Sequence, residues 1–240
     1  MRISSAELPV HRLPITTVGG VALLAGTLTL VVTQGVLHPA LPPGAAEQLT
    51  VIARTRIWHD IQRASLLVMP LVLAGLLACA AAMAGAGARP WAWMGGGLAT
   101  YGVMALSLSY MLLSGPAAAT RTPVAEVAPI DPAILANFEF ILPLVDVAGR
   151  TGTFALGLGV GLLGQGLLAS ALTLPWLGSA VTLLGAIGSI ASLVLDRASP
   201  ASRLAPMSIA AALLLLAAVL FVMPAAPLAQ EPRISADERG

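Results

Sequence analysis

The fold of this chain follows from residues 131–173, which read DPAILANFEFILPLVDVAGRTGTFALGLGVGLLGQGLLASALT. The first half of this stretch places Glu139, Asp146 and Arg150 among apolar residues. The second half, residues 151–173, has no charged residue and is rich in glycine. A helix that crosses the hydrocarbon core of a bilayer needs about 20 apolar residues. We therefore predict a membrane-spanning helix over residues 151–173, preceded by a segment that carries polar groups.

The polar groups of this segment recur at helical spacing. Asp146, Arg150 and Thr153 follow Glu139 by 7, 11 and 14 residues. At about 100° per residue, the four side chains fall within roughly 40° of one another around a helix axis. We therefore expect one polar face that leads into the span.

Composition excludes a single water-soluble domain. Of the 240 residues, 58% are hydrophobic and 10% are charged, whereas soluble domains have about 25% charged residues. The net charge of +1 gives no indication of a nucleic-acid partner. The single cysteine, Cys79, excludes an internal disulfide and a Cys-X-X-Cys redox pair.

Five further apolar runs without charge complete a bundle. They lie at 14–36, 64–86, 91–113, 176–195 and about 206–223. We predict an all-α membrane protein with six transmembrane helices in residues 14–223. A polar tail precedes the bundle at 1–13, and a polar tail that we expect to be disordered follows it at 224–240. Six spans place both termini on the same side of the membrane.

Two interfacial helices are expected on the opposite side, before the second and the fourth span. In the first long loop, 37–63, nothing breaks a helix after Ala45, so we expect that helix to run directly into the span at Ala64. In the second long loop, Asp131 and Pro132 provide a preferred N-cap and a preferred first helical residue.

These two helices carry the candidate polar site. Arg56, Asp60 and Arg63 are spaced at i, i+4 and i+7 and share a helix face. The candidate site comprises Arg56, His59, Asp60 and Arg63 from the first helix and Glu139, Asp146 and Arg150 from the second. We hypothesise that Arg56 or Arg63 forms a salt bridge with Glu139 or Asp146. The functional interpretation is a polar pocket at one mouth of the bundle. The alternative is a structural clasp or two solvated faces, because charged residues are ordinary at a membrane interface.

The glycines of the fourth span predict close helix contacts. They are Gly157, Gly159, Gly161, Gly164 and Gly166. Small residues at such spacing let helix backbones approach one another in membranes. The contacts could lie within the chain or between this chain and a second copy or another subunit. We expect Gly161→Leu to destabilise the fold.

A resemblance adds a topology but no catalytic residue. Leu37-His38-Pro39, the proline-rich stretch after it and Arg56-Ile57-Trp58-His59 are similar to a broad group of six-helix bacterial membrane proteins, which are domains of unknown function. The resemblance implies that the long loops are extracytoplasmic. All 12 basic residues are arginine, which with the many alanines and glycines is typical of a GC-rich bacterial genome. We therefore expect the bacterial inner membrane.

The sequence supports three hypotheses about the function of this protein. The first is a non-enzymatic protein in the lipid bilayer, either a subunit of a membrane assembly or a binder or permease for a small molecule. The second is a redox subunit that holds haem or quinone through His38 or His59, and the third is a lipid-modifying enzyme with Glu139 or Asp146 as a base. Histidine spacing typical of metal sites does not occur, so no metal or cofactor is predicted.

Overall fold

The computed structural model of this protein describes residues 15–83, 87–119, 130–170, 175–195 and 200–223. Within these residues every regular element is a helix. Six helical segments are long and apolar enough to cross a membrane. The chain is therefore a multi-pass, all-α membrane protein, and the predicted fold class is confirmed.

The first span consists of α1 (Ile15–Leu30) and a π-helical turn, η1 (Val31–Leu37), which continues it. The other spans are α3 (Trp58–Ala82), α4 (Arg89–Ala119), α5 (Pro132–Ser170), α6 (Pro175–Val194) and α7 (Leu204–Val222). Two short elements lie between spans: α2 (Ala45–Arg54) and the 3-10 helix η2 (Pro200–Arg203).

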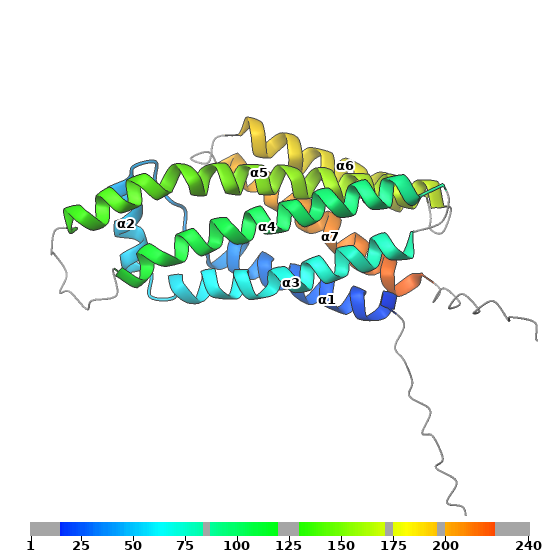
Figure 1. Ribbon diagram of the computed structural model, residues 1–240, viewed down its shortest axis with the longest axis horizontal. Helices are drawn as coiled ribbons and strands as arrows, with labels where there is room; N and C mark the ends of the chain where they lie inside the picture. The colour runs from blue at the N-terminus through cyan, green and yellow to red at the C-terminus, as the bar shows by residue number, and fades with distance from the viewer. Residues whose placement is uncertain (1–14, 84–86, 120–129, 171–174, 196–199, 224–240) are drawn as a thin grey trace, which may run out of the picture.

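The six spans form a ring in chain order. Each span packs on the next along the chain, and α7 packs back on α1. The start of α1 and the end of α7 lie at the same end of the bundle (Figure 1), as an even number of crossings requires. The end of η1 and the connections that contain α2 and η2 lie at the opposite end of the bundle, which we call the loop end.

Glycines allow α5 to pack closely on both of its neighbours. A Cβ atom added at Gly159 would lie 2.5 Å from the backbone nitrogen of Ala99 in α4. A Cβ atom added at Gly164 would lie 2.6 Å from the backbone nitrogen of Thr182 in α6. All five glycines singled out in the sequence are buried inside the chain. Their close contacts therefore serve packing within one chain.

The start of α5 agrees with the expected capping. The backbone nitrogen of Ala133 donates a hydrogen bond of 2.8 Å to Oδ1 of Asp131, and Pro132 is the first helical residue. With 39 residues, α5 is about 58 Å long, nearly twice the thickness of a hydrocarbon core. The interfacial segment predicted before the fourth span is thus continuous with it.

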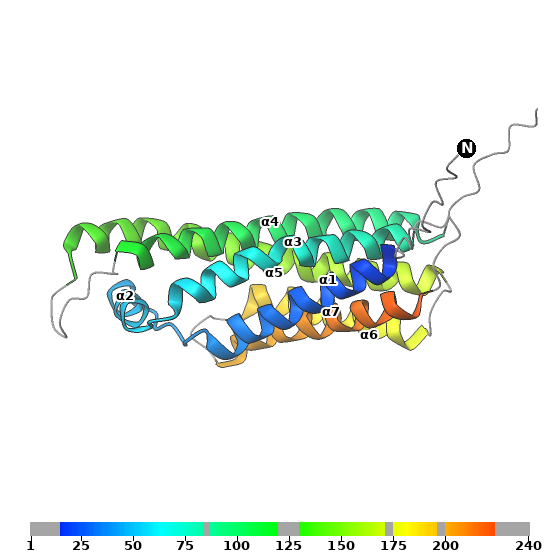
Figure 2. The same cartoon turned by 90° about the horizontal axis from the view of Figure 1, so that it is seen from below.

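At the loop end, α4 and α5 extend beyond α6 and α7, and both views show this (Figures 1 and 2). The short helix α2 lies beneath this extension and contacts α5.

The expectation that the helix after Ala45 runs directly into the second span is wrong. Helix α2 ends at Arg54, and α3 begins at Trp58. At the break, Thr55 has extended backbone angles, and the backbone nitrogen of Trp58 donates to the carbonyl of Thr55 at 2.9 Å. The break lets α2 lie across the direction of α3 (Figure 2).

Burial of apolar side chains explains this break. Leu49 and Ile52 of α2 are buried in a cluster with Phe138 of α5, and Trp58 at the start of α3 joins the same cluster. The indole Nε1 of Trp58 donates to the carbonyl of Leu113 in α4 at 3.3 Å. The gain from burying these side chains favours the turned arrangement over a straight helix.

Candidate functional site

A cavity of about 1060 Å³ lies at the loop end, below the first half of α5. Its wall on α5 includes Glu139, Asp146, Arg150 and Thr153, the four residues predicted to share one face. The other walls are formed by Leu106, Ser109, Tyr110 and Leu113 of α4, by Ala191 and Ser192 of α6 with Leu195 just after it, and by Arg203 of η2 with Ala205 and Pro206 of α7. Gln34 of η1 and residues of the proline-rich loop and of α2 close the remaining side.

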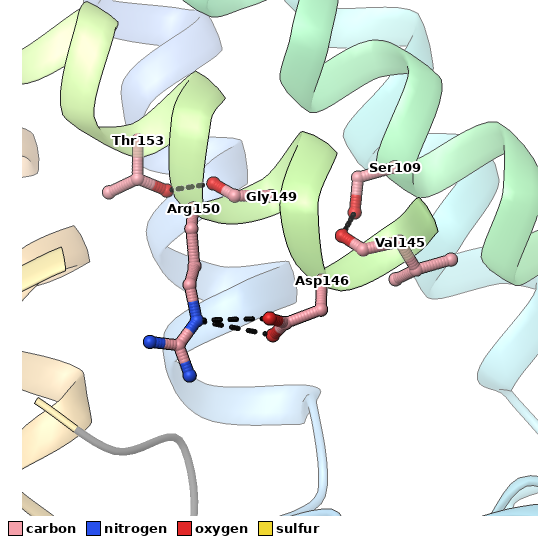
Figure 3. A network of polar contacts seen from close by, with 6 residues as sticks. All are labelled: Ser109, Val145, Asp146, Gly149, Arg150 and Thr153. Atoms are coloured by element: carbon pink, nitrogen blue, oxygen red, sulfur yellow. Dashed lines mark hydrogen bonds and ion pairs between the residues drawn. The ribbon is translucent and has the colours of Figure 1, made fainter. Parts of the chain in front are cut away.

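An ion pair on α5 borders this cavity. Nε of Arg150 lies 3.1 Å from Oδ2 and 3.3 Å from Oδ1 of Asp146, one helical turn away. The side chains are 35% and 37% exposed, respectively, so the pair is partly withdrawn from solvent. Figure 3 shows both contacts as dashed lines from Nε to the carboxylate.

The Nη nitrogens of Arg150 are not used in these contacts. Both lie at the far end of the guanidinium, away from the axis of α5 (Figure 3). Among the described residues, neither has a hydrogen-bond or ion-pair partner. Because an arginine has five N–H groups and only that of Nε is used here, four donors remain for another group.

Hydrogen bonds to backbone fix the neighbouring polar side chains. Thr153 donates from its hydroxyl to the carbonyl of Gly149 at 2.7 Å. Ser109 of α4 donates to the carbonyl of Val145 at 3.3 Å, across the contact between α4 and α5 (Figure 3). The second bond crosses between helices and holds this wall of the cavity together.

The π-helical turn positions Gln34 at the cavity. Nε2 of Gln34 donates to Oγ of Ser65 in α3 at 2.8 Å, and the Ser65 oxygen lies 2.9 Å from Oγ1 of Thr33. This turn links the first span to the second through polar side chains, close to the cavity.

His38 lies directly after the π-turn and also lines the cavity. Its ring is 4.8 Å from the indole of Trp58, at an interplanar angle of 54°. Its Nδ1 lies 2.9 Å from the carbonyl oxygen of Pro39. A carbonyl only accepts, so Nδ1 carries the proton in this contact.

Gln48 of α2 lines the cavity, and its amide is fixed within the protein. Its Nε2 donates to the carbonyl of Pro42 at 2.8 Å, which fixes the amide. Its Oε1 is buried and has no hydrogen-bond partner among the described residues. Because this oxygen is buried within the protein, it is not accessible to a molecule in the cavity.

The four site residues predicted on the helix that enters the second span do not line the cavity. Arg56 is in the break before α3, and His59, Asp60 and Arg63 are on α3. Arg56, Asp60 and Arg63 are exposed, and His59 is partly buried. His38 lines the cavity, and His59 does not.

The salt bridge hypothesised between the two helices is not formed. Among the described residues the only ion pair is that of Arg150 with Asp146, within α5. Helices α2 and α5 do meet, but through Leu49, Ile52 and Phe138 rather than through charges. The break at 55–57 is the physical reason, because it removes Arg56 from the helix face that the spacing assumed.

Most of the cavity wall could not be recognised in the sequence. Arg203 and Gln34 each stand alone among apolar or loop residues, so no spacing connects them with a site. Tyr110 and Ser109 give no signal within the apolar run of the third span. Gln165, the amide deep in the fourth span, donates to Oγ1 of Thr182 in α6 at 3.2 Å, as expected of an interhelical contact.

Comparison with protein-family models, with curated proteins and with solved structures finds no match for this chain. Its candidate function therefore depends on the cavity and on the groups that line it.

Proposed function

We propose that this protein binds a small amphiphilic molecule in the cavity below α5, as a membrane binding protein or permease. The single observation that carries the proposal is a cavity of about 1060 Å³ with a partly exposed ion pair in its wall. Ligand sites in proteins have volumes of about 300–1,000 Å³, mostly apolar walls and a few placed polar groups.

The lining matches a molecule with an apolar and a polar end. Leu106, Tyr110 and Leu113 provide an apolar wall on α4, and Leu142 extends it on α5. The polar groups lie together on the α5 wall next to the charge-free part of that helix. The Arg150 Nη nitrogens, which have no partner among the described residues, support binding of a group that accepts hydrogen bonds.

The experiment is identification of small molecules that co-purify with the full chain in mild detergent, by extraction and mass spectrometry. Thr153→Trp places a large side chain on the cavity wall. Val147→Trp is the matched control, because Val147 is on the same helix, is 63% exposed and does not line the cavity. We expect a molecule that wild type and Val147→Trp retain and that Thr153→Trp loses.

Two results would contradict this function. One is equal retention by all three proteins, which would place the molecule outside the cavity. The other is a wild type that carries no small molecule but brings down a membrane protein, which would favour a subunit of a larger assembly.

We also propose that the membrane is a bacterial inner membrane with the loop end on the extracytoplasmic side. The exclusive use of arginine and the resemblance to six-helix bacterial membrane proteins support this placement. Alkaline phosphatase and green fluorescent protein, each fused after Gly240, test it. We expect fluorescence and no phosphatase activity; an active phosphatase fusion would reverse the orientation.

A further inference from the structure

We propose that Arg150 binds an oxyanion, a carboxylate or a phosphate, on the polar end of the amphiphile. This inference depends on the proposed function, because it names the chemical class of the ligand in the same cavity.

The geometry of Arg150 carries the inference. Asp146 engages Nε at 3.1 and 3.3 Å, so the guanidinium is held by one edge. The end of the fork with both Nη nitrogens is directed away from the α5 axis (Figure 3) and has no partner among the described residues. Two parallel N–H groups on a planar fork match the two oxygens of a carboxylate or phosphate.

The charges around Arg150 favour an anion there. The cavity is lined by two arginines, Arg150 and Arg203, and by two carboxylates, Glu139 and Asp146. Asp146 already contacts Arg150. Glu139 is eleven residues before Arg150, which is about 16 Å along the helix axis. Arg203 comes from a different wall, in η2 just before α7. Apart from Asp146, whose carboxylate Nε already engages, the one carboxylate of the described lining is thus about three turns of α5 away from Arg150.

The position of Arg150 along α5 suits an amphiphile rather than a free ion. Residues 151–170 after it carry no charge and belong to the apolar span. A head group on Arg150 would lie at the boundary between polar and apolar segments, with Tyr110 and Leu106 available to an acyl chain. Partial burial strengthens a charge-assisted hydrogen bond relative to one in water.

The test uses tritiated oleate as the probe, with the full-length protein in dodecyl maltoside, a detergent without carboxylate or phosphate, and empty micelles as background. Unlabelled oleate, oleyl alcohol and inorganic phosphate compete separately. Oleyl alcohol keeps the chain and lacks the charge, whereas phosphate keeps the charge and lacks the chain. We expect oleate to bind, oleyl alcohol to compete at least about tenfold more weakly, and phosphate not to compete.

Three variants test whether Arg150 is the residue that binds the carboxylate of oleate. Arg150→Gln removes the charge and is expected to weaken oleate binding at least about tenfold, while Arg150→Lys, which keeps the charge without the fork, is expected to restore part of it. Arg63→Gln removes an exposed arginine outside the cavity and should bind as wild type does. Thermal unfolding of each variant checks that it is folded.

The outcomes separate the two proposals. Equal competition by oleate and oleyl alcohol, with Arg150→Gln unchanged and Thr153→Trp unable to bind, would overturn the oxyanion and leave a ligand site in the cavity. Oleate binding that survives Thr153→Trp would place the ligand elsewhere and overturn both. Competition by inorganic phosphate at the affinity of oleate would overturn the amphiphile. Absence of oleate binding to the wild type would overturn the oxyanion inference for carboxylate amphiphiles.

Discussion

Gly159 of α5 packs so closely on Ala99 of α4 that a Cβ atom added to Gly159 would lie 2.5 Å from the backbone nitrogen of Ala99. The next nearest atoms, the carbonyl oxygen of Gly95 and Cα of Ala99, are also backbone. Backbone atoms cannot move away as a flexible side chain can. The two helices would have to separate to admit even a methyl group.

Gly159→Ala should therefore destabilise the protein by about 1–3 kcal/mol, the usual cost of overpacking. The measurement is reversible unfolding in detergent. Gly97→Ala is the control, since Gly97 is exposed on α4 and has nothing within 4 Å of an added Cβ. Equal stability of the two variants would mean that the contact between α4 and α5 is looser than described.

We predict that position 161 tolerates a methyl group but not a larger side chain. An added Cβ would meet its nearest atom, the carbonyl oxygen of Thr182, at 3.4 Å, which is ordinary van der Waals contact. We expect Gly161→Ala to unfold within about 0.5 kcal/mol of the wild type. Gly161→Leu should cost about 1–3 kcal/mol, because its extra atoms have no space next to α6. A leucine variant as stable as the alanine variant would indicate that α6 moves freely.

Ser65 is predicted to stabilise the junction of η1 with α3. Ser65→Ala removes the acceptor of the 2.8 Å bond from Gln34 and the contact with Thr33. Leaving the Gln34 amide without this acceptor should cost about 1–3 kcal/mol. Ser107→Ala is the control, because Ser107 bonds only the carbonyl of Val103 in its own helix. Similar losses for both serines would show that the bonds across the junction contribute nothing specific.

Double-mutant cycles should separate the ion pair that forms from the one that was expected. Arg63→Gln combined with Asp146→Asn should give a coupling free energy near zero, because the two side chains form no ion pair. Arg150→Gln combined with Asp146→Asn should give about 0.3–0.5 kcal/mol, the range for i, i+4 pairs on helices. Coupling between Arg63 and Asp146 above that between Arg150 and Asp146 would contradict this assignment.

Much of the fold was predictable because hydropathy is a local property. A run of about 20 apolar residues must be helical in a bilayer, where every backbone polar group needs an internal partner. The start of α5 at Asp131 and Pro132 was equally local, since capping depends on adjacent residues. The polar face with Glu139, Asp146 and Arg150 followed from the helical period alone. These features needed no information about neighbouring helices.

The partners of those residues were decided by tertiary structure. Whether Arg63 or Arg150 pairs with Asp146 depends on how each helix is rotated and where α2 turns away from α3. That turn is set by burial of Leu49, Ile52 and Trp58 against α4 and α5, which involves residues distant in sequence. The cavity is lined by residues of α2, α4, α5, α6 and α7 and of the first span, so it forms only when these distant elements pack together. Hydropathy fixes which segments cross the membrane, whereas the length, rotation and separation of helices are fixed only when all six pack together.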